Sequence, residues 1–208
     1  MAFTSFTSVD QLLEKYGLTQ RREPFVSPLA GVSLSPSTRA DLTLDINTYP
    51  FDRSEIAARE TLIFPVLRDV WRHYREHLTM LSGEPLIGDA DLRGELDYIV
   101  CRRSPHGPYT PDQPFLLVGE AKRDDSTVGW NQALGGMLAA QLHGGPAFIY
   151  YGLATTGTVW RFGKLADTTF TLDPFPYTLS DLDRLAGALH FVFAACRDQV
   201  LLKPPAAA

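Results

Sequence analysis

The chain has 208 residues, of which 45% are hydrophobic and 21% charged, values typical of one soluble globular domain and too small for two ordinary ones. Its formal net charge of −5 argues against a broadly basic surface that coats nucleic acid, although one local basic strip could still hold a phosphate backbone. No apolar run has the length of a membrane span, the first residues lack a secretory signal, and the two cysteines form no metal-ligand pattern. We therefore expect a cytoplasmic protein with free thiols and no membrane contact.

The first quarter of the chain, residues 1–50, predicts an appendage folded onto a larger core. Residues 8–18 have the apolar spacing of a short helix, with Leu12 and Leu13 facing inward. Prolines then interrupt residues 24–50, where we expect two short strands, one around Val32 and one over residues 42–46. No function follows from this segment.

A long helix is predicted to begin near Ser54, which can cap its first turn. Its apolar stripe consists of Ile56, Ile63, Leu67, Val70 and Tyr74. Glu60 lies inside this stripe, whereas Glu55 does not and can simply complement the helix N-terminus. Because a carboxylate in a core-facing stripe needs a partner, we select Glu60 as a site residue. Pro65 is expected to kink or divide the helix.

His73 and His77 belong to the pattern H-x-x-E-H, which resembles the zinc-binding pattern of inverzincin metalloproteases. That chemistry needs a further acidic ligand downstream, and the neighbouring Arg72 and Arg75 would repel a cation. Two histidines on the polar side of a helix are usually surface residues, so a zinc metalloprotease is the weaker alternative.

Two predicted strands, residues 94–100 and 115–122, contain the most unusual polar residues of the chain. Side chains two apart on a strand share a face, so Glu120 and Lys122 should lie together, on the face that also holds Leu116 and Val118. If the strands are neighbours, Asp97 meets Glu120. Two carboxylates beside a lysine favour a hard divalent cation such as Mg²⁺ or Mn²⁺.

The remaining elements continue the alternation of helices and strands. A helix over residues 128–142, capped by residues 124–127, places Gln132 near its start. Strands over 148–153 and 158–162 form a hairpin, and a strand over 168–172 extends it. Residues 180–183 open a C-terminal helix, and residues 203–208 form a frayed tail.

The predicted site has an acid on a helix (Glu60), an acid on a strand (Asp97), a Glu-x-Lys on the next strand (Glu120 to Lys122) and a Gln on the following helix (Gln132). This order resembles the PD-(D/E)xK nuclease superfamily, and the chain is similar to a group of uncharacterised bacterial, especially cyanobacterial, members. The similar segments are Ser54-Glu55, Arg59-Glu60, 62–65, 94–100, 119–122 and 151–162. The chain departs from the pattern in two places. It has no Pro-Asp pair before Asp97, and it carries Gly135-Gly136 where a bulkier or acidic residue is expected.

The resemblance implies an α/β protein with a restriction-endonuclease-like core, a central mixed β-sheet flanked by helices. The core would span residues 51–165, with the appendage 1–50 before it and a strand and helix in 166–208, all in a single domain. The implied activity is divalent-metal-dependent hydrolysis of phosphodiester bonds. The implied site consists of the metal ligands Asp97, Glu120 and Glu60, the carbonyl of Ala121, the catalytic Lys122, and Gln132.

The implied partner is nucleic acid, DNA before RNA, with Arg102, Arg103 and Arg123 as the basic strip. No base-reading module is recognisable, so we expect specificity to come from a partner subunit. A homodimer that cuts both strands also stays open, although no surface in the sequence indicates one. A catalytically silent domain that binds nucleic acid or protein stays open as the alternative. If the three acids converge with only Lys122 to offset them, Asp97→Asn should stabilise the metal-free protein.

Overall fold

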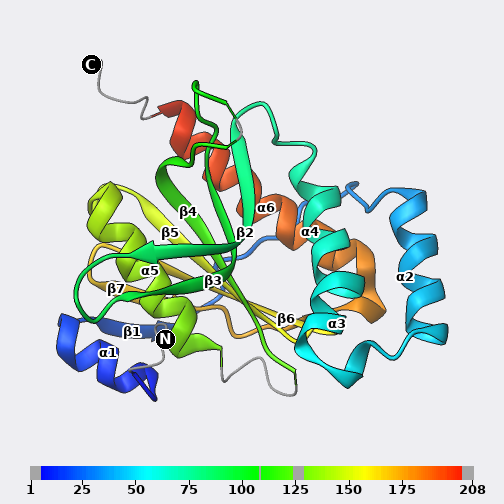
Figure 1. Cartoon of the computed structure of the whole chain (residues 1–208), viewed down its shortest axis with the longest axis horizontal. Helices are drawn as coiled ribbons and strands as arrows, with labels where there is room; N and C mark the ends of the chain where they lie inside the picture. Colours follow the sequence, from blue (N-terminus) through cyan, green and yellow to red (C-terminus); the bar gives the residue numbers. More distant parts are fainter. Residues whose placement is uncertain (1–5, 108, 124–128, 203–208) are drawn as a thin grey trace.

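One mixed β-sheet forms the centre of the protein, as seen in a computed structural model that describes residues 6–107, 109–123 and 129–202 (Figure 1). The strand order is β1-β7-β6-β5-β4-β3-β2, and β8 pairs with β6. The strands are β1 (Thr19–Arg22), β2 (Leu78–Ile87), β3 (Arg93–Arg102), β4 (Asp112–Ala121), β5 (Ile149–Thr155), β6 (Val159–Ala166), β7 (Thr169–Leu172) and β8 (Tyr177–Thr178). The predicted class, a mixed sheet flanked by helices, is confirmed.

Helices cover both faces of this sheet (Figure 1). The helices are α1 (Val9–Tyr16), α2 (Pro36–Thr48), η2 (Phe51–Arg53), α3 (Glu55–Ala58), η3 (Arg59–Ile63), α4 (Phe64–Trp71), α5 (Trp130–Gly144), η4 (Leu179–Asp181) and α6 (Leu182–Leu202). One buried cluster joins α4 and α6 to the sheet, and a second joins α5 and α1 to the opposite face. The core therefore has two layers, one on each side of the sheet.

The sheet is antiparallel from β2 through β4, and parallel where β4 meets β5. Helix α5 makes the crossover between β4 and β5, as a parallel pair requires. The expected hairpin of β5 and β6, and its extension by β7, are confirmed. Ligands of such sheets commonly bind beyond the carboxyl ends of parallel strands, which here includes the end of β4.

The N-terminal quarter is partly as predicted. Helix α1 forms, Ser8 caps it, and Leu12 is fully buried. The strand expected over residues 42–46 is wrong, because those residues belong to α2, where Ser35 is the cap and Pro36 occupies the first turn. Proline thus starts a helix here instead of interrupting a loop. Strand β1, which was not expected, pairs in parallel with β7.

The long helix predicted from Ser54 consists of three pieces. Ser54 caps α3 as expected, but Arg59–Ile63 form a π-helical turn and α4 restarts at Phe64. Pro65 lies in the first turn of α4, directly after the π-helical turn, and the backbone stays helical through Ile63 and Phe64, so the irregularity at this proline is a π-helical turn and not a break. The helix ends at Trp71, although the buried Tyr74 continues the apolar pattern beyond it.

Segment Leu179–Leu202, which contains α6, is long and apolar enough to cross a membrane, which the sequence pattern had not indicated. Half of its most apolar window is buried inside the protein, and Leu185, Leu189 and Phe193 are fully buried against the sheet. The segment packs as a core helix. Cys101 and Cys196 are both buried and unpaired, as expected. The predicted caps at 124–127 and the tail 203–208 lie outside the described residues.

Candidate active site at the end of strand β4

Strands β3 and β4 bring Asp97 and Glu120 together. The two strands pair antiparallel with Tyr98 opposite Gly119, which places Asp97 opposite Glu120 at the next position. The Asp97 carboxylate accepts a hydrogen bond from the Ala121 backbone N–H, with Oδ2 2.7 Å from the nitrogen. The expected neighbourhood of these strands is therefore confirmed.

Glu120 is the most unusual acid of the protein. Its side chain is buried, 2% exposed overall, and its Oε1 has no hydrogen-bond partner in the described part of the chain. Burial and the nearby Asp97 raise the pKa of Glu120 to about 8, while Lys122 lowers it and only partly offsets them. Such a carboxylate is costly unless a ligand satisfies it.

Lys122 lies beside Glu120 and provides the nearby ammonium group. Its Nζ is 3.5 Å from Oε2 of Glu120 and donates a hydrogen bond to the Ala121 carbonyl at 2.8 Å. The backbone N–H of Lys122 donates to the Thr155 carbonyl at 2.8 Å, so pairing with β5 continues past the end of β4. This pairing fixes the backbone that holds Glu120 and Lys122.

The first residues of α5 pack against the same two side chains. A Cβ placed on Gly129 would lie 3.5 Å from the Glu120 Cβ and 3.4 Å from the Lys122 Cγ. Gln132 is half-buried in the first turn of α5, and no hydrogen bond joins it to either carboxylate among the described residues. The helix start therefore lies at the site, without a positioned Gln132.

Part of the predicted strand face differs from the expectation. Val100 pairs with Leu117 while Cys101 pairs with Phe115, so Leu116 is the extra residue of a β-bulge. Leu116 packs in the core cluster of α4 and α6, whereas Val118 packs in the cluster of α5. Only Val118 therefore shares the face of Glu120.

Arg59 is the site residue that the sequence pattern did not reveal. Its Nη1 lies 2.7 Å from Oδ1 of Asp97, and its guanidinium lies over the Tyr98 ring at 5.6 Å. Burial lowers the pKa of Arg59, but Asp97, Tyr98 and Glu55 together raise it further, so the arginine stays charged. The Arg59-Glu60 pair was visible in the sequence, yet only the acid had a predicted role.

Glu60, the predicted third acid, does not lie in the core-facing stripe. Its side chain is exposed and lines a pocket, and Ile56, one turn earlier, is 63% exposed. The reason is the π-helical turn at Arg59–Ile63, whose extra residue per turn rotates Ile56 and Glu60 away from the face that continues in α4. Glu55, which we set aside, instead acts on Glu120 and raises its pKa.

The three arginines predicted as a basic strip are separated. Arg102 pairs with Asp112 at the start of β4, eight residues from Glu120, which at the rise of a strand is roughly 25 Å. Arg102 is buried, and Arg103 is an exposed residue that donates to the Arg75 carbonyl. Arg123, exposed and next to Lys122, is the one that lies at the site.

The two histidines of the H-x-x-E-H pattern do not lie on a helix, since α4 ends at Trp71 and turns follow it. The His73 ring packs against His190, with centroids 5.1 Å apart, while His77 lines a separate pocket with Arg102 and Arg103. The one-turn helical spacing that a zinc pair needs is therefore not formed.

The donors at the end of β4 fit a hard divalent cation bound by two carboxylates. Asp97, Glu120 and the Ala121 carbonyl are oxygen donors, and the buried Oε1 of Glu120 lacks a partner. Mg²⁺ commonly takes one or two protein carboxylates and completes its shell with water and phosphate oxygens. Within the described residues no group of three His, Cys, Asp or Glu side chains gathers around one point, so the predicted three-acid set is not assembled.

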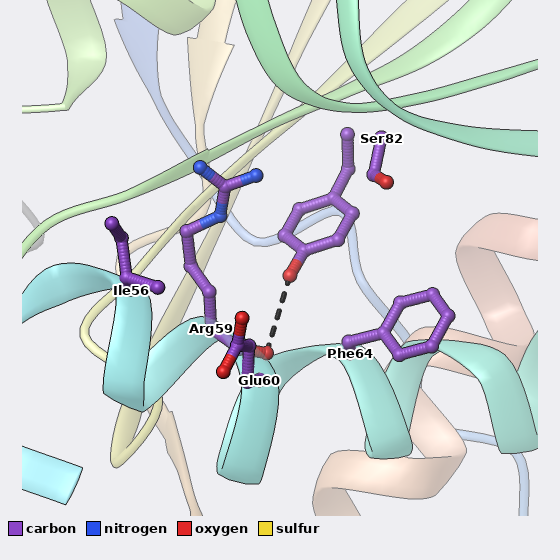
Figure 2. A pocket seen from close by; sticks show the side chains of 6 residues that line it. Ile56, Arg59, Glu60, Phe64 and Ser82 are labelled. Atoms are coloured by element: carbon purple, nitrogen blue, oxygen red, sulfur yellow. Dashed lines mark hydrogen bonds between the residues drawn. The ribbon is translucent and has the colours of Figure 1, made fainter.

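A pocket of about 440 Å³ opens beside this site, between the segment α3–η3–α4 and strands β2 and β3. It is lined by Ile56, Arg59, Glu60, Phe64, Ser82 and Tyr98. Figure 2 shows Ile56 and Phe64 at opposite ends of the helical wall, with Arg59 and Glu60 between them and Ser82 across the pocket. Arg59 belongs both to this pocket and to the ion pair with Asp97.

Comparison of the chain with protein-family models, with curated proteins and with solved structures found no match.

Proposed function

We propose that this protein is a divalent-metal-dependent hydrolase of phosphodiester bonds in nucleic acid, DNA before RNA, with a restriction-endonuclease-like core. The observation that carries the proposal is the buried Glu120 carboxylate, whose Oε1 has no partner among the described residues, opposite Asp97 and beside Lys122. A fold rarely keeps an unsatisfied buried acid unless a ligand or a reaction uses it.

The roles of the residues follow from their chemistry. Mg²⁺ or Mn²⁺, held by Asp97, Glu120 and the Ala121 carbonyl, would stabilise charge on the scissile phosphate and lower the pKa of its water. The Lys122 ammonium, 3.5 Å from Glu120, orients the attacking water through a hydrogen bond from Nζ and balances the two carboxylates. Arg59 pairs with Asp97 through Nη1, and its other guanidinium N–H groups can donate to a phosphate oxygen.

The test is cleavage of single-stranded and double-stranded DNA and RNA by the purified protein with Mg²⁺, with Mn²⁺ and with a chelator. Lys122→Ala should lower the metal-dependent rate at least about a hundredfold, since a positioned acid–base group contributes that much or more. Lys164→Ala is the matched control, because Lys164 is also half-buried but lies on β6 against Phe25. Equal rates for the two variants would remove Lys122 from the mechanism.

One observation favours the second candidate, a silent domain that binds nucleic acid without cutting it. The Arg59 guanidinium already pairs with Asp97, and the Lys122 ammonium already pairs with Glu120 and bonds the Ala121 carbonyl, so internal cations contact all three proposed oxygen donors. In that case binding to nucleic acid would persist in chelator, and no metal would produce cleavage. Cleavage that depends on Lys122 decides against this candidate.

A further inference from the structure

The pocket beside the candidate site has the walls of a site for a flat aromatic ligand. Phe64 contributes a half-buried aromatic ring, and Ile56 adds an aliphatic side chain that is 63% exposed. Tyr98 is 4% exposed with the Arg59 guanidinium over its ring, so it lines the pocket as a buried residue. The Tyr98 hydroxyl donates to the Arg59 carbonyl at 3.4 Å, the dashed line in Figure 2, which holds the ring in place. Large apolar side chains left open at a pocket are expected where a ligand covers them.

The polar groups of the pocket are few and placed apart from one another. Glu60 and Ser82, both exposed, offer a carboxylate and a hydroxyl to the pocket. A carboxylate accepts hydrogen bonds from amino groups, such as the exocyclic amine of cytosine. A volume of about 440 Å³ lies within the range of small-ligand sites and accommodates one nucleotide.

The position of the pocket links it to the candidate site. Arg59 lines the pocket and also pairs with Asp97, so one side chain of the pocket contacts an acid of the candidate site. A phosphate bound by Lys122 and by a cation on Asp97 and Glu120 would therefore place its adjoining nucleoside on the side of Arg59 and the pocket. A base inside a duplex is stacked and paired on both sides, and cannot enter without leaving the helix.

We propose that this pocket binds one unstacked base of single-stranded nucleic acid, next to the phosphate, with Ile56 and Phe64 packing on the ring and Glu60 accepting from its exocyclic amino group. The position of the phosphate rests on the proposed function, whereas the base-binding pocket does not need catalysis. The substrate class is therefore a single strand, or an unpaired end or loop.

The first experiment measures binding of the wild-type protein, in chelator, to a short single strand that carries 2-aminopurine at one position. Stacking in the pocket should change the fluorescence of this base. Ile56→Glu should weaken binding by about tenfold, as expected for the loss of one base stack. Ile87→Glu is the matched control, since Ile87 is 62% exposed at the far end of β2 and outside the pocket.

The change at Ile56 lies on the surface, so the fold should survive it, and a thermal melt checks this. Phe64→Ala provides a second test of the same wall and should weaken binding in the same direction. Equal affinity of the Ile56, Phe64 and Ile87 variants would overturn the proposal. A duplex of the same sequence that binds as tightly, with the same loss on Ile56→Glu, would overturn the assignment to unpaired bases.

The second experiment tests the hydrogen bond from the base. Wild-type protein should bind single strands of cytosine more tightly than single strands of thymine, because thymine has no exocyclic amine. Glu60→Gln should reduce this preference severalfold, since an amide can also donate to the thymine carbonyl. An unchanged ratio would remove Glu60 from base recognition.

The outcomes separate this proposal from the nuclease proposal. Binding that depends on Ile56, without any metal-dependent cleavage, would leave the base pocket standing and refute the catalytic function. Cleavage that depends on Lys122 but is indifferent to Ile56→Glu, in binding as in rate, would support the nuclease and refute the pocket.

Discussion

Two buried acids at different corners of the sheet have opposite surroundings. Asp173, 5% exposed after β7, accepts hydrogen bonds from the backbone N–H groups of Phe25, Val26 and Phe175 at 2.9–3.0 Å. Glu120, 2% exposed at the end of β4, keeps one oxygen without a partner in the described part of the chain. Burial alone therefore does not distinguish the two acids, whereas the unmet hydrogen-bonding capacity of Glu120 does.

The chemistry of the neighbours explains the difference. Asp173 binds the backbone N–H groups of residues 25 and 26 just after β7. Its carboxylate therefore accepts the hydrogen bonds that a neighbouring strand would otherwise accept. Glu120 lies opposite a second acid and beside a lysine, and within residues 6–107, 109–123 and 129–202 it fastens no backbone segment. We interpret Asp173 as a structural acid and Glu120 as the acid kept for a ligand.

The largest effect is expected from Asp173→Ala. It leaves three backbone N–H groups near the core without an acceptor, which should cost about 4 kcal/mol in the free energy of unfolding. Urea unfolding measures the loss, with Asp41→Ala on the exposed side of α2 as the control. A loss below about 1 kcal/mol would contradict the structural role of Asp173.

The pH dependence of stability should come from Glu120 and sharpen the contrast. Folded Glu120 keeps its proton up to about pH 8, whereas the unfolded chain releases it near 4.5, so the folded state binds more protons in this window. Metal-free stability should therefore fall as the pH rises from 5 to 8, by about 3 kcal/mol at most.

Urea unfolding of the wild type and of Glu120→Gln at several pH values checks this expectation. The amide does not titrate, so the variant should lose much less stability over the same window. Parallel pH profiles for both proteins would show that Glu120 ionises normally in the fold.

Metal should distinguish the two acids as well. If Mn²⁺ binds the folded protein at Glu120 and Asp97, a concentration of a hundred times its Kd should stabilise the wild type by about 2.7 kcal/mol. Glu120→Gln should lose most of this shift, while Asp41→Ala should keep it. Thermal melts with Mn²⁺ and with chelator provide the measurement, and an equal shift in Glu120→Gln would place the metal elsewhere.

The smallest effect concerns Asp97 and reverses the expectation from the sequence. With only Lys122 as a counter-charge, Asp97→Asn was expected to stabilise the metal-free protein. The structure instead pairs Asp97 with Arg59 and with the Ala121 N–H, so the amide should cost about 1 kcal/mol in chelator. A higher melting temperature for Asp97→Asn in chelator would show that repulsion by Glu120 outweighs the Arg59 pair.

The sequence by itself determined the strands of the candidate site and the residues they hold. A period of two is a local property, so the face shared by Glu120 and Lys122 could be read directly, and β3 beside β4 follows from their short connection. Helix α1 and the hairpin of β5 and β6 were equally predictable, because capping and turn residues act over a few positions.

Tertiary structure alone decided which helical side chains reach that site. The five residues of η3 form a π-helical turn, which turns Glu60 outward to the pocket and leaves Arg59 against Asp97. Periodicity assumes a uniform helix, so it could not place either residue. The pairing of β1 with β7, across about 150 positions of the chain, and the position of Arg102 at the far end of β4 likewise depend on long-range packing, which no local pattern encodes.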